Sequence, residues 1–306
     1  MHDVIIIGAG PAGLTAALYA GRYRLDTQIL EKISAGGQIV MSSSIENYPG
    51  FPGSVNTFDL ADKMKKQVED LGIDITMEEV LEIVPGDKIN MWIVRTADHS
   101  YEARSVIIAV GAQSKRLGVK GEEKLIGLGV SYCGTCDGPL YKNKEVAVIG
   151  GGDRAVEEAL FLTRYASRVH LIHRRDNLRA SAILVEKARS EHKINLILNT
   201  TVEEIIGEKK FEKLLLKNIN SQDTRELVCQ GIFIFVGVAP NTDFVKTLLK
   251  TDDKGFIIAD QNMRTSQEGI FACGDCCQKS FRQVVTACSD GAVAAFSVNS
   301  YLDNLK

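Results

Sequence analysis

The residues best suited to chemistry are two cysteines separated by only two positions. They are Cys133 and Cys136 in the stretch CGTCD, with Asp137 directly after the second. Two thiols at this spacing can form a disulfide that opens and closes, bind a metal as thiolates, or form a permanent cross-link. A thiolate in such a motif is activated by a lowered pKa, and a neighbouring carboxyl group such as that of Asp137 can transfer the proton.

A structural zinc site is the first alternative for this pair. Cys273 and Cys276, with Cys277 adjacent, supply a second pair of thiols, and four thiolates would satisfy a tetrahedral site. The two pairs lie much farther apart than the ligands of a zinc ribbon, and Cys273 falls in a segment typical of a buried strand. We therefore favour a redox-active first pair, and we interpret the three later cysteines as small hydrophobic residues rather than a redox centre.

Composition bounds the class of protein. The chain has 306 residues, 45% hydrophobic and 25% charged, which is ordinary for a globular protein of about two domains. A net charge of −3 gives no reason to expect nucleic acid or an anionic membrane as a partner. An apolar strand starts directly after Met1-His2-Asp3, and no apolar stretch approaches the roughly 20 residues that span a bilayer. We expect a cytoplasmic protein, where close cysteine pairs are more often catalytic or metal-binding than permanent cross-links.

The elements that must position the cysteines come from a repeated motif. Residues 4–10 read VIIIGAG and residues 146–152 read VAVIGGG, and each segment leads into a helical pattern and a second strand. The first glycine turn has Gly8, Gly10 and Gly13, and the second has glycines at 150 and 152 with alanine at 155. Glycines here allow a tight turn and let the backbone approach a pyrophosphate, which the helix N-terminus then binds. Both copies are therefore predicted to be dinucleotide-binding units.

The two copies differ where the second strand ends. Glu31 ends this strand in the first copy, and a carboxylate there accepts hydrogen bonds from a ribose 2′-hydroxyl and repels a 2′-phosphate. The second copy has His173, Arg174 and Arg175, with Arg179 close behind, and guanidinium groups match phosphate. The first copy thus suits FAD or NAD and the second suits NADP, which indicates a flavoprotein supplied by a nicotinamide cofactor.

The boundaries of the domains follow from two further buried strands. Residues 106–113 and 232–241 each run into glycine and are expected to close one unit. The tail that follows, which includes residues 270–275 and a C-terminal helix from about Asp290 to Leu302, is too short to be a domain, so it should complete the first one. We expect an α/β protein with two Rossmann-like dinucleotide-binding domains, the second inserted into the first. Residues 1–113 and 242–306 would bind FAD, and residues 114–241 would bind NADPH and carry the cysteine pair.

Several motifs together resemble the low-molecular-weight, bacterial-type thioredoxin reductases over nearly the whole chain. They are GAGPAG at 8–13, GGQI at 36–39, ENYPG at 46–50, CGTCD at 133–137, HRRDNLRA at 173–180, GVAPNT at 237–242, GD at 274–275 and RQV at 282–284. The resemblance implies the two-domain flavoprotein disulfide reductase fold, with FAD and NADPH as cofactors. It implies FAD contacts at Gly8, Gly10, Pro11, Ala12, Gly13, Glu31, Gly37, Gln38, Asn47, Val80, Ala109, Gly111, Gly274, Asp275, Arg282, Gln283 and Val284. It implies NADPH contacts at Gly152, Asp153, Arg154, His173, Arg174, Arg175 and Arg179.

The resemblance also implies roles and partners. Cys136 would be the flavin-facing thiol, Cys133 the thiol that attacks the disulfide of thioredoxin or a thioredoxin-like protein, and Asp137 the acid that handles protons. The family forms homodimers, and its NADPH domain rotates between two arrangements. A related ferredoxin–NADP reductase would lack the CxxC pair, and a ferredoxin-fed thioredoxin reductase would lack the basic cluster. Peroxiredoxin-reducing relatives carry extra N-terminal domains, and an NADP-sensing protein needs no cysteine pair.

Two features depart from the usual pattern of the family. Arg154 stands where Ser or Thr is commoner, directly after the second glycine turn. We expect its guanidinium group to meet a phosphate of NADPH, and the alternative is that it obstructs the cofactor site. The cysteines at 273, 276 and 277 are the other unusual feature.

Overall fold

The computed structural model describes residues 1–41, 44–45, 47–87 and 89–305. They form two compact units. Unit 1 comprises Met1–Val40, Tyr48–Gln113 and Ala239–Lys306, and unit 2 comprises Met41–Asn47 and Ser114–Val238. The chain passes between the units at β9 (Ala112–Ser114) and returns at β18 (Val238–Pro240). Residue 46 of the ENYPG motif lies outside the described residues.

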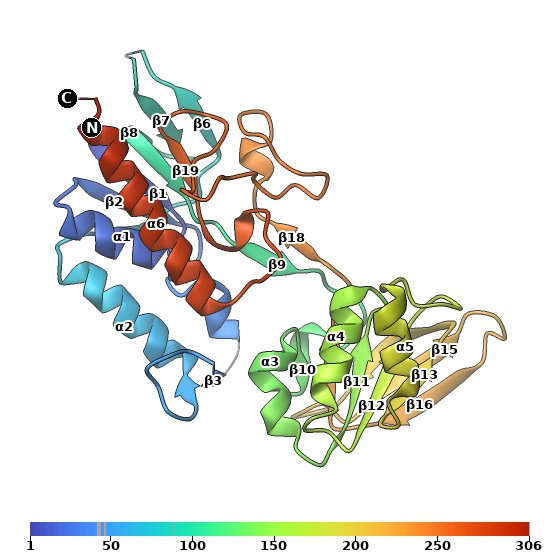
Figure 1. Ribbon diagram of the computed structural model, residues 1–306. Coiled ribbons are helices and arrows are strands. Elements are labelled where there is room, and N and C mark those ends of the chain that lie inside the picture. Colours follow the sequence, from blue (N-terminus) through green and yellow to red (C-terminus); the bar gives the residue numbers. More distant parts are fainter. Residues whose placement is uncertain (42–43, 46, 88, 306) are drawn as a thin grey trace. The chain divides into compact units, whose positions relative to one another are not determined.

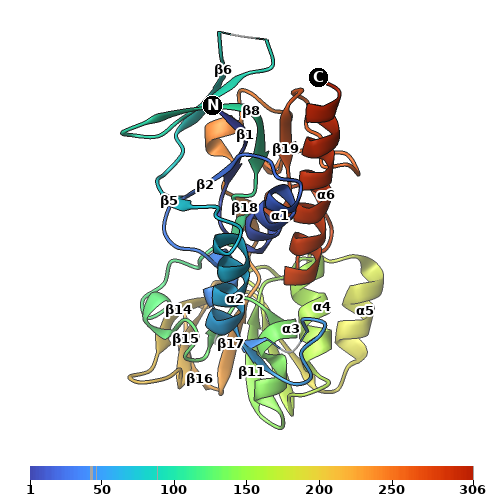
Figure 2. The ribbon, with the colours of Figure 1, turned by 90° about the vertical axis from the view of Figure 1, so that its left-hand side faces the viewer.

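Unit 1 is built on a mixed sheet with the strand order β5-β2-β1-β8-β7-β6; β5 is labelled in Figure 2 and the other strands in Figure 1. Its strands are β1 (His2–Ile7), β2 (Thr27–Glu31), β5 (Ile75–Met77), β6 (Glu82–Pro85), β7 (Trp92–Arg95) and β8 (Ser100–Ile108). Strands β5, β2, β1 and β8 are parallel, whereas β7 runs antiparallel to its neighbours. The last part of β8 pairs with β19 (Ile270–Ala272) instead of β7. Apolar residues along β1 alternate between two core clusters, one on each face of the sheet, as the period of a strand requires.

One face of this sheet is covered by helices α1 (Pro11–Arg22), α2 (Thr57–Glu69) and α6 (Val284–Asp303), of which α1 and α6 lie side by side (Figure 2). The C-terminal helix begins at Val284, earlier than the expected start near Asp290. The reason is a capping box, in which Gln283 and Thr286 exchange hydrogen bonds at the first turn. The short elements of this unit are β4 (Val55–Asn56), η4 (Asp243–Val245) and η5 (Gly274–Cys276), and η1 (Gly37–Met41) begins in it.

Unit 2 has a parallel sheet with the strand order β10-β17-β11-β12-β13. Its strands are β10 (Val130–Ser131), β11 (Glu145–Ile149), β12 (Arg168–Ile172), β13 (Ile194–Ile197) and β17 (Gly231–Ile234). Helices α4 (Asp153–Leu162) and α5 (Ala182–Ser190) cover one face through residues such as Val156 and Ala188. An antiparallel sheet of β14 (Thr200–Ile206), β15 (Lys213–Asn218) and β16 (Thr224–Val228) packs on the other.

The remaining short elements of unit 2 are β3 (Ser44–Ile45) in the 41–47 segment, η2 (Glu123–Leu125) before β10, and α3 (Gly134–Asp137) and η3 (Gly138–Tyr141) after β10. Within the described part of the chain, no helix combines the length and the apolar character needed to cross a bilayer. The β1–α1–β2 and β11–α4–β12 segments have the same topology, as the repeated sequence motif predicts.

Candidate active site

The cysteine pair lies where strand β10 turns into helix α3. Cys133 and Cys136 form a disulfide, with their Cα atoms 5.4 Å apart. The backbone N–H of Cys136 donates a hydrogen bond to Cys133 Sγ over 3.2 Å, and the backbone N–H of Cys133 donates to Ser131 Oγ over 3.1 Å. These bonds fix residues 133–137, here called the CxxC turn, in a conformation that brings the two sulfur atoms together. Both cysteines are partly exposed, which a thiol that exchanges with another molecule requires.

Helix α3 packs closely against helix α4 because it has glycine on the contact face. A Cβ atom added at Gly134 would lie 2.1 Å from Glu158 Oε2, and one added at Gly138 would lie 3.1 Å from a methyl group of Leu162. No larger residue fits at Gly134 without moving Glu158. The glycine inside the CxxC motif therefore allows a side chain of α4 to reach the CxxC turn.

Asp137 is in an environment that favours its protonated form. Burial of the carboxyl group raises its pKa, and a hydrogen bond with the side chain of Ser131 offsets part of this effect. A carboxyl group whose pKa is raised keeps its proton closer to neutral pH, so it can donate that proton to a sulfur atom. The structure thus brings all three predicted catalytic residues together, and it adds Ser131, which the sequence analysis did not identify.

The second glycine turn precedes helix α4 in unit 2. Gly150 has φ +152°, and a Cβ atom there would lie 2.5 Å from the carbonyl oxygen of Phe235. Gly152 is the N-cap of α4, no side chain caps the helix, and nothing lies within 4 Å of a Cβ atom built on it. The start of α4 therefore has no side-chain cap, and the space next to the Gly152 Cα atom is open. These features fit the pyrophosphate of a dinucleotide.

The four residues of the predicted basic cluster fall into two groups. Arg174, Arg175 and Arg179 are exposed and lie in residues 174–179, here called the arginine loop. The backbone N–H of Arg179 donates a hydrogen bond to the carbonyl oxygen of Gly151 over 2.6 Å, which joins this loop to the glycine turn. His173 is 5% exposed and packs against Gly151. Burial, followed by the three arginines, lowers the pKa of His173, so this imidazole is neutral near pH 7. Three cationic side chains are therefore available to a phosphate, and His173 supports the turn beneath them.

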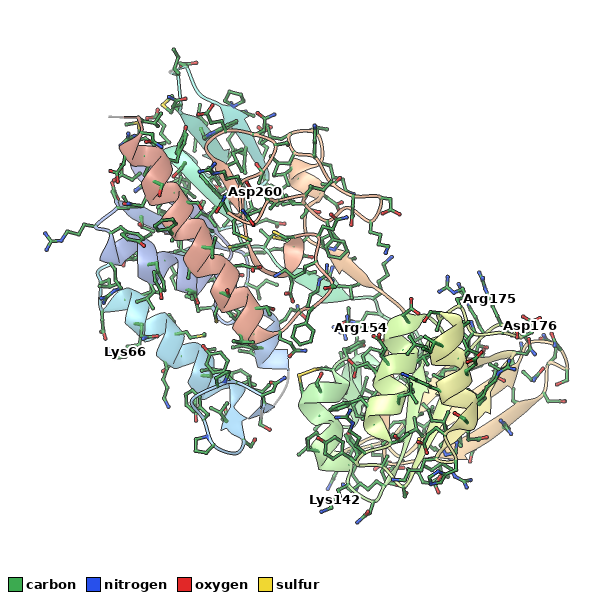
Figure 3. All side chains as sticks on the ribbon, in the orientation of Figure 1. Lys66, Lys142, Arg154, Arg175, Asp176 and Asp260 are labelled. Atoms are coloured by element: carbon green, nitrogen blue, oxygen red, sulfur yellow. A yellow bond between two sulfur atoms is a disulfide. The ribbon has the colours of Figure 1, made fainter. Side chains whose placement is uncertain are left out.

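Arg154 and Asp153 occupy the first turn of α4. The carboxylate of Asp153 accepts a hydrogen bond from the backbone N–H of Ser181 over 2.7 Å, which joins α4 to the start of α5. The guanidinium carbon of Arg154 lies 5.6 Å from the ring centroid of Phe235, a cation–π contact. Figure 3 shows Arg154 at the end of α4 where the glycine turn enters, and Arg175 extending from the unit. Arg154 is exposed, so an anion at this turn can reach its side chain.

The first glycine turn has the same geometry in unit 1. Gly8 has φ +104°, and a Cβ atom there would lie 2.6 Å from the carbonyl oxygen of Ala109. A Cβ atom at Gly13 would lie 1.9 Å from the carbonyl oxygen of Gly8, so α1 approaches β1 only because this residue is glycine. Gly10 caps α1 without a side-chain hydrogen bond. As in the second turn, uncapped N–H groups beside bare backbone fit a pyrophosphate.

Glu31 stabilises the first glycine turn from the end of β2. Its Oε2 atom accepts the N–H of Ala9 over 2.7 Å, and its Oε1 atom accepts the N–H of Ile33 over 2.9 Å. A carboxylate oxygen has two lone pairs, so both atoms can still accept a hydrogen bond from a ribose hydroxyl. Glu31 therefore shapes the loop and fits the predicted contact with FAD.

Other residues of the predicted FAD site lie at several places. Gly37 approaches Gly10, with 3.1 Å from a built Cβ atom to the Gly10 Cα atom. At the helix starts, Pro11 and Ala12 open α1, and Val284 opens α6 after its N-cap Gln283. Gln38 is exposed in η1, and Asn47 ends the 41–47 segment of unit 2. Val80 is buried between β5 and β6, and Gly111 has φ +63°.

The loop before α6 is held by a guanidinium group. Arg282 donates to the carbonyl oxygens of Lys279 over 2.9 Å and Cys277 over 3.2 Å, and its guanidinium carbon lies 4.2 Å from the ring centroid of Phe256. Gly274 donates its N–H to Asp290 Oδ2 over 3.1 Å, and Asp275 follows in η5. Arg282 thus positions the loop that contains the GD motif of the predicted FAD site.

The later cysteines pack as small apolar residues. Cys273 and Cys276 are fully buried and Cys277 is 4% exposed. Burial raises the pKa of Cys273 well above its usual value, which keeps the thiol protonated and unreactive. Among the residues that the structure describes, no three His, Cys, Asp or Glu side chains are grouped so as to hold a metal ion.

Comparisons with known proteins extend over both units. A family model described as pyridine nucleotide-disulphide oxidoreductase matches residues 2–291. A thioredoxin reductase of Treponema pallidum is 47% identical over 305 residues, which are 100% of this chain and 98% of that protein. One of Bacillus subtilis is 42% identical over 307 residues, covering 100% and 96%. The crystal structure of thioredoxin reductase from Streptococcus pyogenes has a TM-score of 0.93 and 44% identity, with 99% of each chain covered.

Proposed function

The chain belongs to the pyridine nucleotide-disulphide oxidoreductase family and, within it, to the thioredoxin reductases, and from this premise we propose which residues transfer the electrons. It is an NADPH-dependent oxidoreductase that uses FAD and acts on a disulfide. Its substrate is the disulfide of thioredoxin or a thioredoxin-like protein. The observation that supports this function most directly is the Cys133–Cys136 disulfide with the buried carboxyl group of Asp137 next to it.

The chemistry of the CxxC turn is thiol–disulfide exchange. Two electrons for the protein disulfide would be supplied by FAD when it is bound, with NADPH as their source. Reduction of Cys133–Cys136 consumes two electrons and two protons and breaks the S–S bond. Cys133 gives its proton to solvent, and its thiolate attacks one sulfur atom of the partner's disulfide, whose S–S bond breaks; the partner's other sulfur leaves and takes a proton from Asp137. Cys136 then loses its proton and attacks Cys133 Sγ of the mixed disulfide, which restores Cys133–Cys136. The partner's second sulfur leaves, takes up a proton, and completes the dithiol.

Each unit would bind one cofactor. The first glycine turn, Glu31 and the loop held by Arg282 support FAD binding by residues 1–113 and 242–306. The second glycine turn and the exposed arginines support NADPH binding by residues 114–241. The functional protein would be a cytoplasmic homodimer, in keeping with the resemblance to the family.

An anaerobic titration of the purified protein tests this function. We expect the absorbance bands of oxidised flavin to bleach when NADPH is added and to return when oxidised thioredoxin follows. Bleaching without return would contradict the proposed substrate, and a protein without flavin bands would contradict the proposed use of FAD.

The arginine loop predicts a preference for NADPH over NADH. Replacing Arg174 and Arg175 by Gln should lower kcat/KM for NADPH by about two to four decades and leave NADH almost unaffected, because each of the two contacts between a charged donor and phosphate is worth about 1.5–3 kcal/mol. Arg225→Gln, at an exposed position of β16, is the matched control and should change neither value. Equal losses with the two cofactors would show that the cluster does not recognise the 2′-phosphate.

Arg154 gives a second prediction about NADPH. A cation at a helix N-terminus is unfavourable unless an anion compensates it, so we expect Arg154→Ser to raise the KM for NADPH about tenfold. Arg164→Ser is the matched control, because Arg164 also stacks on a phenylalanine, with 5.3 Å to the ring centroid of Phe161, but lies after the end of α4. Steady-state kinetics show whether the KM for NADPH rises or falls in Arg154→Ser. A lower KM in Arg154→Ser would mean that the native side chain obstructs the site.

A further inference from the structure

A second carboxyl group, separate from Asp137, contacts the CxxC turn. Glu158 lies in the middle of α4, and its Oε2 atom is buried without a hydrogen-bond partner. This atom would lie 2.1 Å from a Cβ atom at Gly134, the residue that follows Cys133 in the chain. The carboxyl group therefore lies directly against the backbone between the two cysteines, and the exchange chemistry described above gives it no role.

The surroundings of Glu158 contain few groups that balance its charge. Burial raises its pKa, the charge of Arg154, one turn earlier in α4, and the nearby backbone of Gly134 lower it again, and the charge of Glu157 raises it. The helix α3, which packs on α4, also contains Asp137, and η3, which follows it, contains Tyr141. Glu158 is ionised above its raised pKa and neutral below it.

A carboxylate at this place changes the stability of the reduced cysteine pair relative to the disulfide. It repels a thiolate at Cys133 but not the neutral thiol or the disulfide. The reduced form is thereby destabilised above the pKa of Glu158, and a pair whose reduced form is destabilised is a stronger reductant. In a protein that must reduce the disulfide of another protein, this effect favours electron transfer toward the partner.

We propose that Glu158 is a positioning residue of the CxxC turn, whose negative charge against Gly134 disfavours the Cys133 thiolate and makes the Cys133–Cys136 pair more reducing. The proposal deepens the proposed function and rests on it for one point only, that a more reducing cysteine pair favours electron transfer to the partner protein. The charge effect itself belongs to the cysteine pair and can be measured without NADPH or thioredoxin.

The test is the equilibrium between the purified protein and a glutathione redox buffer, measured over a pH series that extends above the raised pKa of Glu158. The shifts given below are those expected above that pKa. Two glutathione molecules become one glutathione disulfide for each protein disulfide reduced, so atoms and electrons balance. Glu158→Gln should shift this equilibrium about tenfold toward the protein dithiol, which corresponds to about 30 mV. It should also lower the pKa of the Cys133 thiol, measured by the pH dependence of alkylation with iodoacetamide and mass spectrometry of the peptide.

Two variants and one pH series separate charge from packing. Glu157→Gln removes the same charge from an exposed neighbour on α4 and should leave the equilibrium unchanged. Glu158→Asp keeps the charge and should stay within about threefold of the unsubstituted protein. The difference between Glu158→Gln and the unsubstituted protein should vanish at acidic pH, where Glu158 is neutral.

The proposal is overturned if Glu158→Gln leaves the equilibrium unchanged or shifts it toward the disulfide. It is also overturned if Glu157→Gln or Glu158→Asp shifts it as far, or if the shift persists at acidic pH, because each of these results points to altered packing. Failure of the anaerobic titration with thioredoxin, by contrast, would refute the proposed substrate and leave this result standing.

Discussion

Cys133→Ser is expected to reduce thioredoxin only at the uncatalysed background rate while its flavin is still reduced by NADPH. The serine hydroxyl cannot form a disulfide with Cys136 or a mixed disulfide with the substrate, so electrons stop at the flavin. Stopped-flow absorbance of the first half-reaction should match that of the unsubstituted protein. Turnover measured with thioredoxin and a disulfide dye should fall to the level without enzyme.

Another cysteine of unit 2 provides the control for this result. Cys229 is 1% exposed, and burial raises its pKa to about 12, so it cannot act as a nucleophile near neutral pH. Cys229→Ser should retain thioredoxin turnover. If Cys133→Ser turned over thioredoxin at the normal rate, the CxxC turn would not be the exchange site, and both the proposed function and the roles of its residues would be wrong.

The fold was predictable from the sequence because its strongest signals are local. The repeated glycine turns need a buried strand before them and a helix after them, and Gly8 and Gly150 adopt positive φ against the carbonyl oxygens of Ala109 and Phe235. The α/β class and the duplicated unit followed from that pattern. The expected strand over residues 106–113 is instead β8, ending at Ile108, and β9, starting at Ala112, because Gly111 turns the chain with φ +63°.

The parts of the site that the sequence analysis missed depend on packing between segments. Ser131 and Glu158 approach the CxxC turn only because β10 leads into α3 and α3 packs on α4. A glycine between two cysteines and an arginine four residues before a glutamate are visible in the sequence, but they do not indicate that the two segments meet. His173 was grouped with the arginines by adjacency in sequence, whereas the end of β12 buries it against Gly151.

Asp137→Asn is expected to slow thioredoxin reduction by about 10² to 10⁴, the range over which general acid catalysis acts. Asn has nearly the shape of Asp and keeps the CxxC turn, but it cannot give a proton to a departing sulfur atom. Reduction of the flavin by NADPH should be unchanged, since no thiol takes part in it. Asp223→Asn, at an exposed position of the same unit, should have no effect on either step.

The pH dependence of this rate distinguishes a proton donor from a structural carboxyl group. Because burial raises the pKa of Asp137, the carboxyl group is protonated below that raised pKa and loses its proton as the pH rises through it. The rate of thioredoxin reduction by the unsubstituted protein should therefore fall as the pH rises through the pKa of Asp137, and this fall should be absent in Asp137→Asn. If the variant is slower at every pH but shows the same fall, another acid donates the proton. Glu158, the other buried carboxyl group at the CxxC turn, would then be the first residue to test, with Glu158→Gln measured over the same pH range.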